Sequence, residues 1–507
     1  MNQSIQPQFL GHPKGLFYLF FAELWERFSF YGMRALLMVY MTEEIYRALT
    51  ERDIIASTIY AAYGSLVYAT PVLGGMLADR LLGLRRSILL GGSLMALGHF
   101  VLALDSQITF FLALGLLIVG NGLFKPNISS FVGSLYEQGD NRRDSGFTIF
   151  YMGINIGAFV APLFCGWLGF EYGWHYGFAA AGIGMMMGII VFWYGLRKGI
   201  FGERGYAPDE NYLNNSWVGL KIKHVVPVCA FFIAPLVALI MYYGNLSIPL
   251  IGEVDYQGQL VNYVFWIILI VILYVIIKTM MEVDKVERER MVVIVFLTMF
   301  LTLFWGFYEL AGSTLTLFAL RNVNLVWINA SQTNAITAFF IIALALFFSW
   351  FWVFLAKKKR NPFTPYKFAF GLLILAIGYV VFWLSGNFAD ATGRVPFVFM
   401  VVGYMFFSTG ELFMSPVGLS KVTELAPKKV ASFMMGVLFL SSAFAFRLVG
   451  LVGNLLAVEG SAEDSDPMVS LEIYTAGFEQ IAYVTLAGAV VAFLLAPVLK
   501  KWMHNIH

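Results

Sequence analysis

The stretch Glu23-Leu24-Trp25-Glu26-Arg27-Phe28-Ser29-Phe30-Tyr31-Gly32-Met33-Arg34 places two carboxylates and two guanidinium groups in an otherwise apolar segment, which is predicted to be a helix over 16–41. At about 100° per residue, the charged residues and Tyr31 fall on one face of this helix. Charges at membrane depth are costly and commonly face a cavity or a partner. The stripe therefore predicts a functional site. The alternative is an ion pair that only holds helices together.

The composition indicates an integral membrane protein. The chain has 507 residues, of which 59% are hydrophobic and 13% charged, and its mean hydropathy is +0.75. Soluble domains carry about 25% charged residues. The net charge of +2 comes without a basic tract, which argues against nucleic acid as a partner. Residues 1–15 do not resemble a cleaved signal, so the first helix is expected to remain.

Apolar stretches of the length that spans a bilayer, about 20 residues, recur along the chain. They form a first set of six, a pair and a second set of six: 16–41, 54–78, 86–104, 108–134, 146–169, 175–197; 223–244, 260–281; 291–318, 332–356, 363–386, 396–420, 430–457, 473–499. Most of the 33 Lys and Arg residues then fall in the termini and in loops on one side. The positive-inside rule places both termini in the cytoplasm.

Two six-helix halves are the layout of the major facilitator transporters, whose site lies between the halves near the bilayer midplane. The predicted fold is therefore an all-α integral membrane protein with two six-helix bundles and a two-helix linker hairpin, which makes fourteen transmembrane helices. The expected domains are 1–200, 201–287 and 288–507. The hairpin is expected to lie outside the working core, because it carries almost no charge at depth.

The loop after the second helix resembles the cytoplasmic signature of that superfamily. Its glycines would let two helix ends approach closely, and its charges would form a breakable ionic latch. The alternative is a charged turn that only obeys the positive-inside rule. The residues assigned to this gating loop are Gly75, Asp79, Arg80, Arg85 and Arg86.

Eight ionisable side chains are predicted to lie deep in helices, four acidic and four basic. A balanced set can pair inside a cavity, and pairs across the halves would form and break as the halves move. Lys125 precedes Pro126 in a glycine-rich segment and needs an anion at such depth. The eight are Glu23, Glu26, Arg27, Arg34, Lys125, Glu309, Glu411 and Arg447.

Two carboxylates of the second half stand in distinctive surroundings. Glu411 shares a helix face with Ser408 and Ser415, and a carboxylate that gains and loses a cationic partner can carry a proton. Glu309 follows Trp305 by four residues, so an aromatic shelf lies beside a carboxylate. This arrangement suits a ligand that carries both a cation and an apolar side chain.

Uncharged polar residues add weaker candidates, because such residues also serve as interhelical contacts. They are Tyr68, Tyr151, Asn155 and Asn334. The histidines and the two cysteines match no metal-ligand spacing, and no phosphate-binding glycine loop is present, so neither a cofactor nor ATP hydrolysis is expected. No catalytic residues are assigned, and the chain is not expected to be an enzyme.

At these residues the sequence resembles the proton-dependent oligopeptide transporter family, over essentially the whole chain. The first-helix stretch carries the resemblance, together with Gly122-Leu123-Phe124-Lys125-Pro126-Asn127, Phe150-Tyr151-Met152-Gly153-Ile154-Asn155-Ile156-Gly157, Phe304-Trp305 with Glu309, and Gly410-Glu411-Leu412-Phe413-Met414-Ser415-Pro416-Val417-Gly418-Leu419. Fourteen helices with an extra hairpin is the pattern of its bacterial members.

The resemblance implies uptake of di- and tripeptides driven by the proton gradient. It assigns Arg34 and Lys125 to the peptide carboxylate, and Asn155, Asn334 and Glu411 to the amine, with Glu309 nearby. It assigns proton coupling to Glu23, Glu26 and Arg27, and the mechanistic hypothesis adds Glu411 as a proton carrier and Lys125 as a cation that reclaims a carboxylate. Residues that would line the pocket are Tyr31, Tyr68 and Trp305, and the candidates Tyr151 and Ser415 complete the substrate set.

Several positions depart from the usual pattern of the family: Phe30, Leu310, Ala335, Leu438 and Arg447. They bear on substrate preference more than on the transport class.

The sequence thus predicts a proton-coupled peptide symporter in a bacterial inner membrane, with peptide, protons and the lipid bilayer as partners; nothing indicates an oligomer. The alternatives are a transporter of nitrate or another small anion, or a drug exporter, on the same fold. A more remote alternative is a receptor or structural membrane protein without transport.

Overall fold

The structure is a computed structural model that describes residues 8–137, 140, 142–217, 220–243, 259–427, 431–461 and 466–504. Within these residues it is all-helical apart from three two-stranded pairs. Helices are present at each of the 14 predicted membrane spans, with ends within a few residues of those expected in most cases, although the span 291–318 is interrupted at Glu309. The predicted fold class is confirmed.

Ten helical stretches among the described residues are long and apolar enough to cross a membrane, and Val398–Met414 and Leu440–Leu455 are shorter apolar stretches. The first helix, Lys14–Tyr40, is not among the ten, and it is the helix with the charged stripe.

The chain forms two compact units. Unit 1 comprises Met1–Leu37 and Leu66–Tyr243, and unit 2 comprises Met38–Ser65 and Gly244–His507. The end of the first helix and the beginning of the second thus belong to unit 2. The two hairpin helices also belong to different units. The expected domain boundaries stay a prediction.

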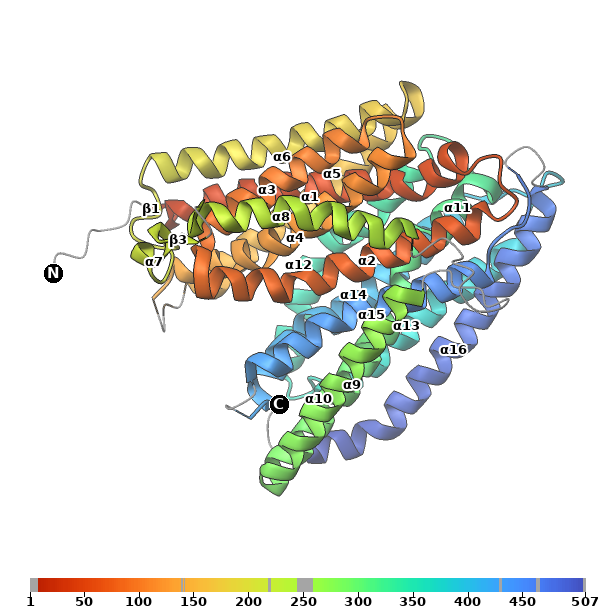
Figure 1. The fold of residues 1–507 in the computed structure, drawn as a ribbon. Coiled ribbons are helices and arrows are strands. Elements are labelled where there is room, and N and C mark those ends of the chain that lie inside the picture. The colour runs from red at the N-terminus through yellow and green to blue at the C-terminus, as the bar shows by residue number, and fades with distance from the viewer. Residues whose placement is uncertain are drawn as a thin grey trace. The chain divides into compact units, whose positions relative to one another are not determined.

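Unit 1 is built from helices that run side by side (Figure 1). Its elements are α1 Lys14–Tyr40 (to Leu37), α2 Arg52–Leu77 (from Leu66), the π-helical turn η2 Ala78–Leu82, α3 Gly83–Leu102, α4 Gln107–Ser134, α5 Arg143–Glu171, α6 Trp174–Arg197, α7 Glu210–Asn214 and α8 Ile222–Tyr243, with the strand pairs β1 Gln8–Phe9 with β2 His12–Pro13 and β3 Ser216–Trp217 with β4 Leu220–Lys221.

The hairpin helix α8 packs against α4 (Figure 1). Ala230 and Ala234 of α8 join a buried cluster with Leu94, Leu116 and Leu123. Small side chains on α8 let its backbone come close to α4.

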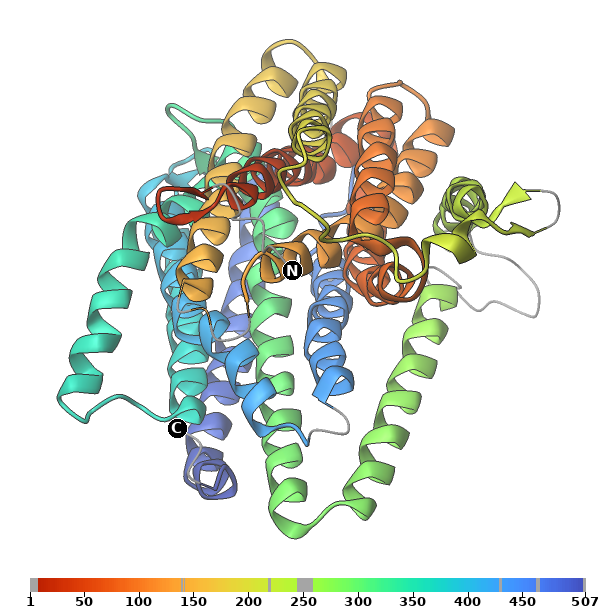
Figure 2. The ribbon, with the colours of Figure 1, turned by 90° about the vertical axis from the view of Figure 1, so that its left-hand side faces the viewer.

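Unit 2 contains the second set of six helices and the other hairpin helix. Its elements are the π-helical turn η1 Met41–Ile45, α9 Gln259–Glu282, α10 Lys285–Tyr308, the 3-10 turn η3 Glu309–Gly312, α11 Thr314–Asn322, β5 Val323–Asn324, the 3-10 turn η4 Ser331–Asn334, α12 Ala335–Lys357, α13 Thr364–Ser385, the 3-10 turn η5 Gly386–Phe388, β6 Val395–Pro396, α14 Val398–Leu425, α15 Ala431–Leu455 and α16 Pro467–Trp502. Strands β5 and β6 pair in parallel. A short turn joins α9 to α10, as Figure 2 shows.

Glycines bring α2 and α4 into close contact near the gating loop. A Cβ added at Gly74 would meet the backbone carbonyl of Gly122, whereas a Cβ added at Gly75 would lie 3.7 Å from the side chain of Pro126, an ordinary contact. Asn127 of α4 donates a hydrogen bond of 3.3 Å to the Gly74 carbonyl. The close approach therefore depends on Gly74 and not on its neighbour.

We expect Gly74→Ala to lower the thermal stability of the detergent-purified protein, at a cost of about 1–3 kcal/mol, because the new methyl group would force two backbones apart. Gly75→Ala is the matched control and should leave the unfolding temperature almost unchanged. Equal effects of the two substitutions would contradict this account of the helix contact.

Candidate functional site

The charged stripe on α1 forms a compact group of buried ions. Arg27 donates a hydrogen bond of 2.8 Å from Nη2 to Oε1 of Glu26, and its Nε lies 3.2 Å from Oε1 of Glu23. All three side chains are at most 3% exposed. The second carboxylate oxygen of Glu23 is buried and accepts no hydrogen bond from the described residues. One guanidinium therefore pairs with two carboxylates. Glu23 is the carboxylate with an oxygen that accepts no hydrogen bond from the described residues.

Lys125 is the other cation that acts on Glu23. Its Nζ lies 4.1 Å from the centre of the Tyr68 ring. The contact between α2 and α4 explains this position, because a Cβ at Gly122 would collide with Thr70, two residues beyond Tyr68. The family motif around Lys125 thus places its ammonium beside an aromatic ring and within electrostatic reach of the α1 carboxylates.

The remaining candidates of unit 1 lie on α1 and α5. The Arg34 guanidinium carbon lies 6.0 Å from the Tyr31 ring centre, and Arg34 is buried. Asn155 is buried and donates a hydrogen bond of 3.0 Å to the Tyr151 carbonyl, one helical turn earlier. The Tyr151 side chain is 45% exposed.

Glu309 lies where a predicted helix is interrupted. The segment 291–318 was expected to be continuous, but α10 ends at Tyr308, and Glu309 begins the 3-10 turn η3 before α11. A broken helix leaves backbone carbonyls without their usual partners, and in a membrane these need other donors. Tyr379 of α13 donates a hydrogen bond of 2.6 Å to the Phe307 carbonyl. Thr316 donates one of 2.8 Å to Ala311.

A second carboxylate, Glu411 on α14, is associated with this turn. Glu411 and Glu309 are both 7% exposed, and the charge of Glu309 acts on Glu411. Tyr308 donates a hydrogen bond to the Glu411 carboxylate. Tyr308 was not among the candidates from the sequence, although its position next to Glu309 is a signal for it. The Tyr308 ring centre lies 5.1 Å from that of Trp305, so the predicted aromatic shelf is present.

The neighbouring polar residues connect to the same turn. Asn334 donates a hydrogen bond of 3.0 Å to the Thr316 hydroxyl, which itself bonds η3. Ser408 instead donates to the Thr337 carbonyl at 2.9 Å, so it joins α14 to α12. The side chain of Ser415 lies outside the described residues. Unit 2 therefore brings together Trp305, Glu309, Asn334 and Glu411.

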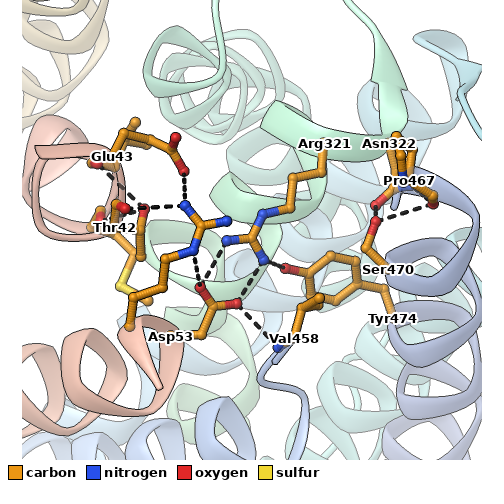
Figure 3. A network of polar contacts seen from close by, with 12 residues as sticks. Thr42, Glu43, Asp53, Arg321, Asn322, Val458, Pro467, Ser470 and Tyr474 are labelled. Carbon is orange, nitrogen blue, oxygen red and sulfur yellow. Dashed lines mark hydrogen bonds and ion pairs between the residues drawn. The ribbon is translucent and has the colours of Figure 1, made fainter. Parts of the chain in front are cut away.

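A separate network of buried ions lies within unit 2 (Figure 3). Arg321 at the end of α11 donates hydrogen bonds of 2.6 and 2.7 Å to the two oxygens of Asp53, at the beginning of α2. Arg321 also donates to the Tyr474 hydroxyl at 2.8 Å, and the Val458 amide donates to Asp53 at 3.1 Å. These contacts explain why the first part of α2 belongs to unit 2.

Arg52, the residue before Asp53, extends the network. It donates hydrogen bonds of 2.9 Å to Glu43 and 3.1 Å to the Thr42 carbonyl. A cavity of about 220 Å³ adjoins these ions and is lined by both Arg52 and Arg321. Neither arginine was a candidate from the sequence, because sequence spacing cannot reveal that Asp53 and Arg321, separated by 268 positions, form a pair.

The arginines of the gating loop bind the connector that follows α6. Arg85 donates a hydrogen bond of 2.6 Å to the Arg204 carbonyl, and Arg86 donates two bonds of 2.8 Å to Glu210. Asp79 and Arg80 are exposed, and among the described residues neither has an ion pair. The breakable latch stays a prediction.

The hydrogen bonds from Arg86 hold the pKa of the Glu210 carboxyl below its usual range. The stabilisation that they provide is therefore present above the ordinary carboxyl pKa and is lost as the pH falls through the lowered value.

Arg447 contacts the hairpin. Its guanidinium carbon lies 5.8 Å from the ring centre of Phe265 on α9, and this ring also packs against Phe444 at 5.6 Å. Arg447, one of the departures from the usual family pattern, thus lies at the contact between α15 and α9.

Comparison with known proteins identifies the family of this chain. The POT family model matches residues 85–465. This chain belongs to the POT family. A solved structure of a family member, described as peptide transporter POT in complex with sulfate, has a TM-score of 0.82 and 34% identity, and the match covers 99% of this chain and 98% of that one.

Two curated relatives are of similar length. The transporter YclF of Bacillus subtilis, described as uncharacterized, is 35% identical over 100% of this chain and 99% of its own. A di-/tripeptide transporter of Lactococcus lactis is 35% identical over 86% of this chain and 88% of its own. The family resemblance in the sequence is thus confirmed, and the chain is a multi-pass membrane transporter of the POT family.

Asp53→Asn should destabilise this POT-family protein strongly, by about 3–5 kcal/mol, because it leaves the buried Arg321 guanidinium without its carboxylate. The double variant Asp53→Asn, Arg321→Met removes the unpaired charge and should be more stable than the single variant. Thermal unfolding of the purified proteins measures both. A double variant that is less stable than Asp53→Asn alone would contradict the role given to this ion pair.

Proposed function

We propose that this chain is a proton-coupled symporter that imports di- and tripeptides by alternating access, in a bacterial inner membrane, with both termini in the cytoplasm. Family membership supports the transport class, and the Lactococcus relative supports the substrate class. The observation that carries the residue assignments is the separation of buried charges. Cations lie beside aromatic rings in unit 1, whereas in unit 2 the charge of Glu309, in the turn η3, acts on Glu411 of α14.

Arg34 and Lys125 are assigned to the peptide carboxylate. Each has an aromatic ring at its side, Tyr31 and Tyr68 respectively. A guanidinium and an ammonium can each donate several hydrogen bonds to a carboxylate, and such charge-assisted bonds are the stronger ones. The rings of Tyr31 and Tyr68 would contact the adjoining part of the peptide.

Glu411 and Asn334 are assigned to the peptide amine, with Glu309 close to both. A carboxylate that already accepts a hydrogen bond from Tyr308 retains sites for an ammonium group. Trp305 offers an aromatic face for the side chain of the peptide. Asn155, Tyr151 and Ser415 complete the substrate set as predicted from the sequence.

The proton is assigned to Glu411 and to the group of Glu23, Glu26 and Arg27. In this group one guanidinium faces two carboxylates, so a proton on Glu23 or the charge of Lys125 would balance the group. A peptide carboxylate that engages Lys125 would withdraw that charge and favour protonation of Glu23. This exchange couples peptide binding to proton binding.

The ion pair between Asp53 and Arg321 is assigned to closure of the outer side. It connects the beginning of α2 with α11, α16 and the Val458 amide within unit 2. Opening this side would have to break the pair, at a cost that peptide and proton binding must offset. The gating-loop residues Gly75, Asp79, Arg80, Arg85 and Arg86 are assigned to the opposite side.

Labelled dialanine should accumulate in proteoliposomes under an imposed inward pH gradient, and a protonophore should abolish the accumulation. Glu411→Gln should lose accumulation while retaining peptide exchange without a gradient, because binding survives but proton transfer does not. Glu472→Gln, an exposed carboxylate on α16, is the control.

Full accumulation by Glu411→Gln would contradict its assignment. Inhibition of uptake by nitrate or by an apolar drug, with none by dipeptides, would replace the peptide function with one of the alternatives on the same fold.

Lys125→Gln should weaken binding of dialanine about tenfold or more, because a charge-assisted hydrogen bond to the carboxylate is lost. The same variant should bind dialanine amide almost as well as the wild type does. Lys198→Gln is a matched control, because Lys198 is also near a tyrosine ring, at 5.5 Å from Tyr194, but on an exposed surface. Calorimetry with both peptides makes the comparison. Equal losses for the peptide and its amide would exclude Lys125 as the carboxylate ligand.

A further inference from the structure

A group of lysines from α13, α14 and α16 lies at one end of unit 2. The connection between α12 and α13 and the C-terminal end of α16 lie at this end (Figure 2). Phe363, just before α13, confirms the proximity, because its ring centre lies 3.7 Å from Nζ of Lys500 on α16. The distribution of Lys and Arg predicts that this end faces the cytoplasm.

Lys367, in the first turn of α13, is the central residue of the group. It is only 9% exposed, and its Nζ lies 4.4 Å from the ring centre of Trp352 on α12. Across the part of the chain that the structure describes, the Lys367 ammonium has no hydrogen bond and no ion pair, whereas the backbone amide of Lys367 donates to the Phe363 carbonyl. Lysines are almost never buried without a partner. This one has only an aromatic face.

The charge that acts on Lys367 is another cation. Lys421, on α14, exerts a like-charge interaction on it. The Lys421 ammonium lies 2.6 Å from a carboxylate oxygen of Glu424, so that carboxylate is already engaged. Two neighbouring cations, one of them buried, favour the binding of an anion between them.

Further positive charge surrounds the same place. Lys500 contributes an ammonium from α16, and the N-terminal end of α13 has no side-chain cap on its backbone amides. The first turn of a helix carries a partial positive charge. The sequence adds the run 357–360, which is Lys-Lys-Lys-Arg, directly before α13.

The Lys367 ammonium can be reached from outside. Side chains on a helix tilt toward its N-terminus, so Lys367 extends toward the end of α13 that meets the loop. Its Nζ is not among the fully enclosed polar atoms that lack a partner in the described chain. A lysine that buries its stem and presents its ammonium at the level of the lipid headgroups is typical of the membrane interface.

We propose that Lys367, together with Lys421 and Lys500, binds the phosphate group of an anionic phospholipid. The adjoining face of α12 favours a lipid over free phosphate, because Phe347 and Trp350 are 51% and 59% exposed and form an apolar surface for an acyl chain. Basic pockets between membrane helices on the cytoplasmic side suit such headgroups. The site is separate from the peptide residues and does not depend on the proposed function.

The test measures binding of lipid to the full-length protein in a neutral detergent. Phosphatidylglycerol is titrated while native mass spectrometry records the bound lipid and thermal unfolding records the stability. Wild-type protein should bind phosphatidylglycerol and unfold at a higher temperature with it. Lys367→Met should weaken this binding about fivefold or more, because the methionine fills the same space without the charge. Lys501→Met, which removes a neighbouring exposed charge on α16, should bind as the wild type does.

A second variant and two control ligands distinguish a phospholipid site from a general anion site. Lys500→Met changes an exposed residue, so folding is not at risk, and it should also weaken binding of phosphatidylglycerol. Phosphatidylcholine and inorganic phosphate should each leave the unfolding temperature unchanged. Equal binding by wild type, Lys367→Met and Lys500→Met would overturn the proposal. An equal stabilisation by inorganic phosphate would show that the site takes the free anion and would overturn the assignment to lipid.

Discussion

The pairing of Arg27 with both Glu23 and Glu26 on α1 is the interaction on which the residues assigned to transport depend. Arg27 compensates one negative charge and leaves the group of Glu23 and Glu26 with an excess of one. In a low-dielectric interior such an excess is tolerated only when another charge lies close by. A proton on Glu23 or the ammonium of Lys125 can supply it. The excess negative charge of Glu23 and Glu26 can thus be compensated in two ways, by a proton on Glu23 or by the ammonium of Lys125. Substrate binding can select between these two states.

Two buried carboxylates of unit 2, Asp53 and Glu411, have different kinds of hydrogen-bond partner. Asp53 is saturated, with a bidentate arginine and a backbone amide, and this arrangement suits a contact that is either wholly formed or wholly broken. Glu411 receives a hydrogen bond from a neutral tyrosine, Tyr308, and has a second carboxylate nearby. A neutral donor imposes no fixed charge on its partner, so this carboxylate can exist with or without a proton at little structural cost.

The sequence allowed most of the helices to be placed, because spans of about 20 apolar residues leave little choice in a bilayer. It also predicted the buried glutamates and Lys125, since charges are rare in such spans. The interruption after Tyr308 could not be predicted, because the segment 291–318 has no proline and Glu309 is its single charged residue. Asp53 and Arg321 were also missed as a pair, because each looks like an ordinary loop charge until the chain folds. The partners of the gating-loop arginines lie in a connector that hydropathy does not resolve.

The hydrogen bond from Tyr379 to the Phe307 carbonyl makes α13 a helix through which this transporter can evolve. The position of Glu309 is fixed partly by a hydroxyl from α13, a helix that supplies no residue to the assigned substrate set. Genetic variation in α13 can therefore shift the Glu309 carboxylate without altering any residue that is assigned to the substrate. A selection for new transport properties would accordingly recover variants in α13, and an inventory of binding residues alone would not explain them.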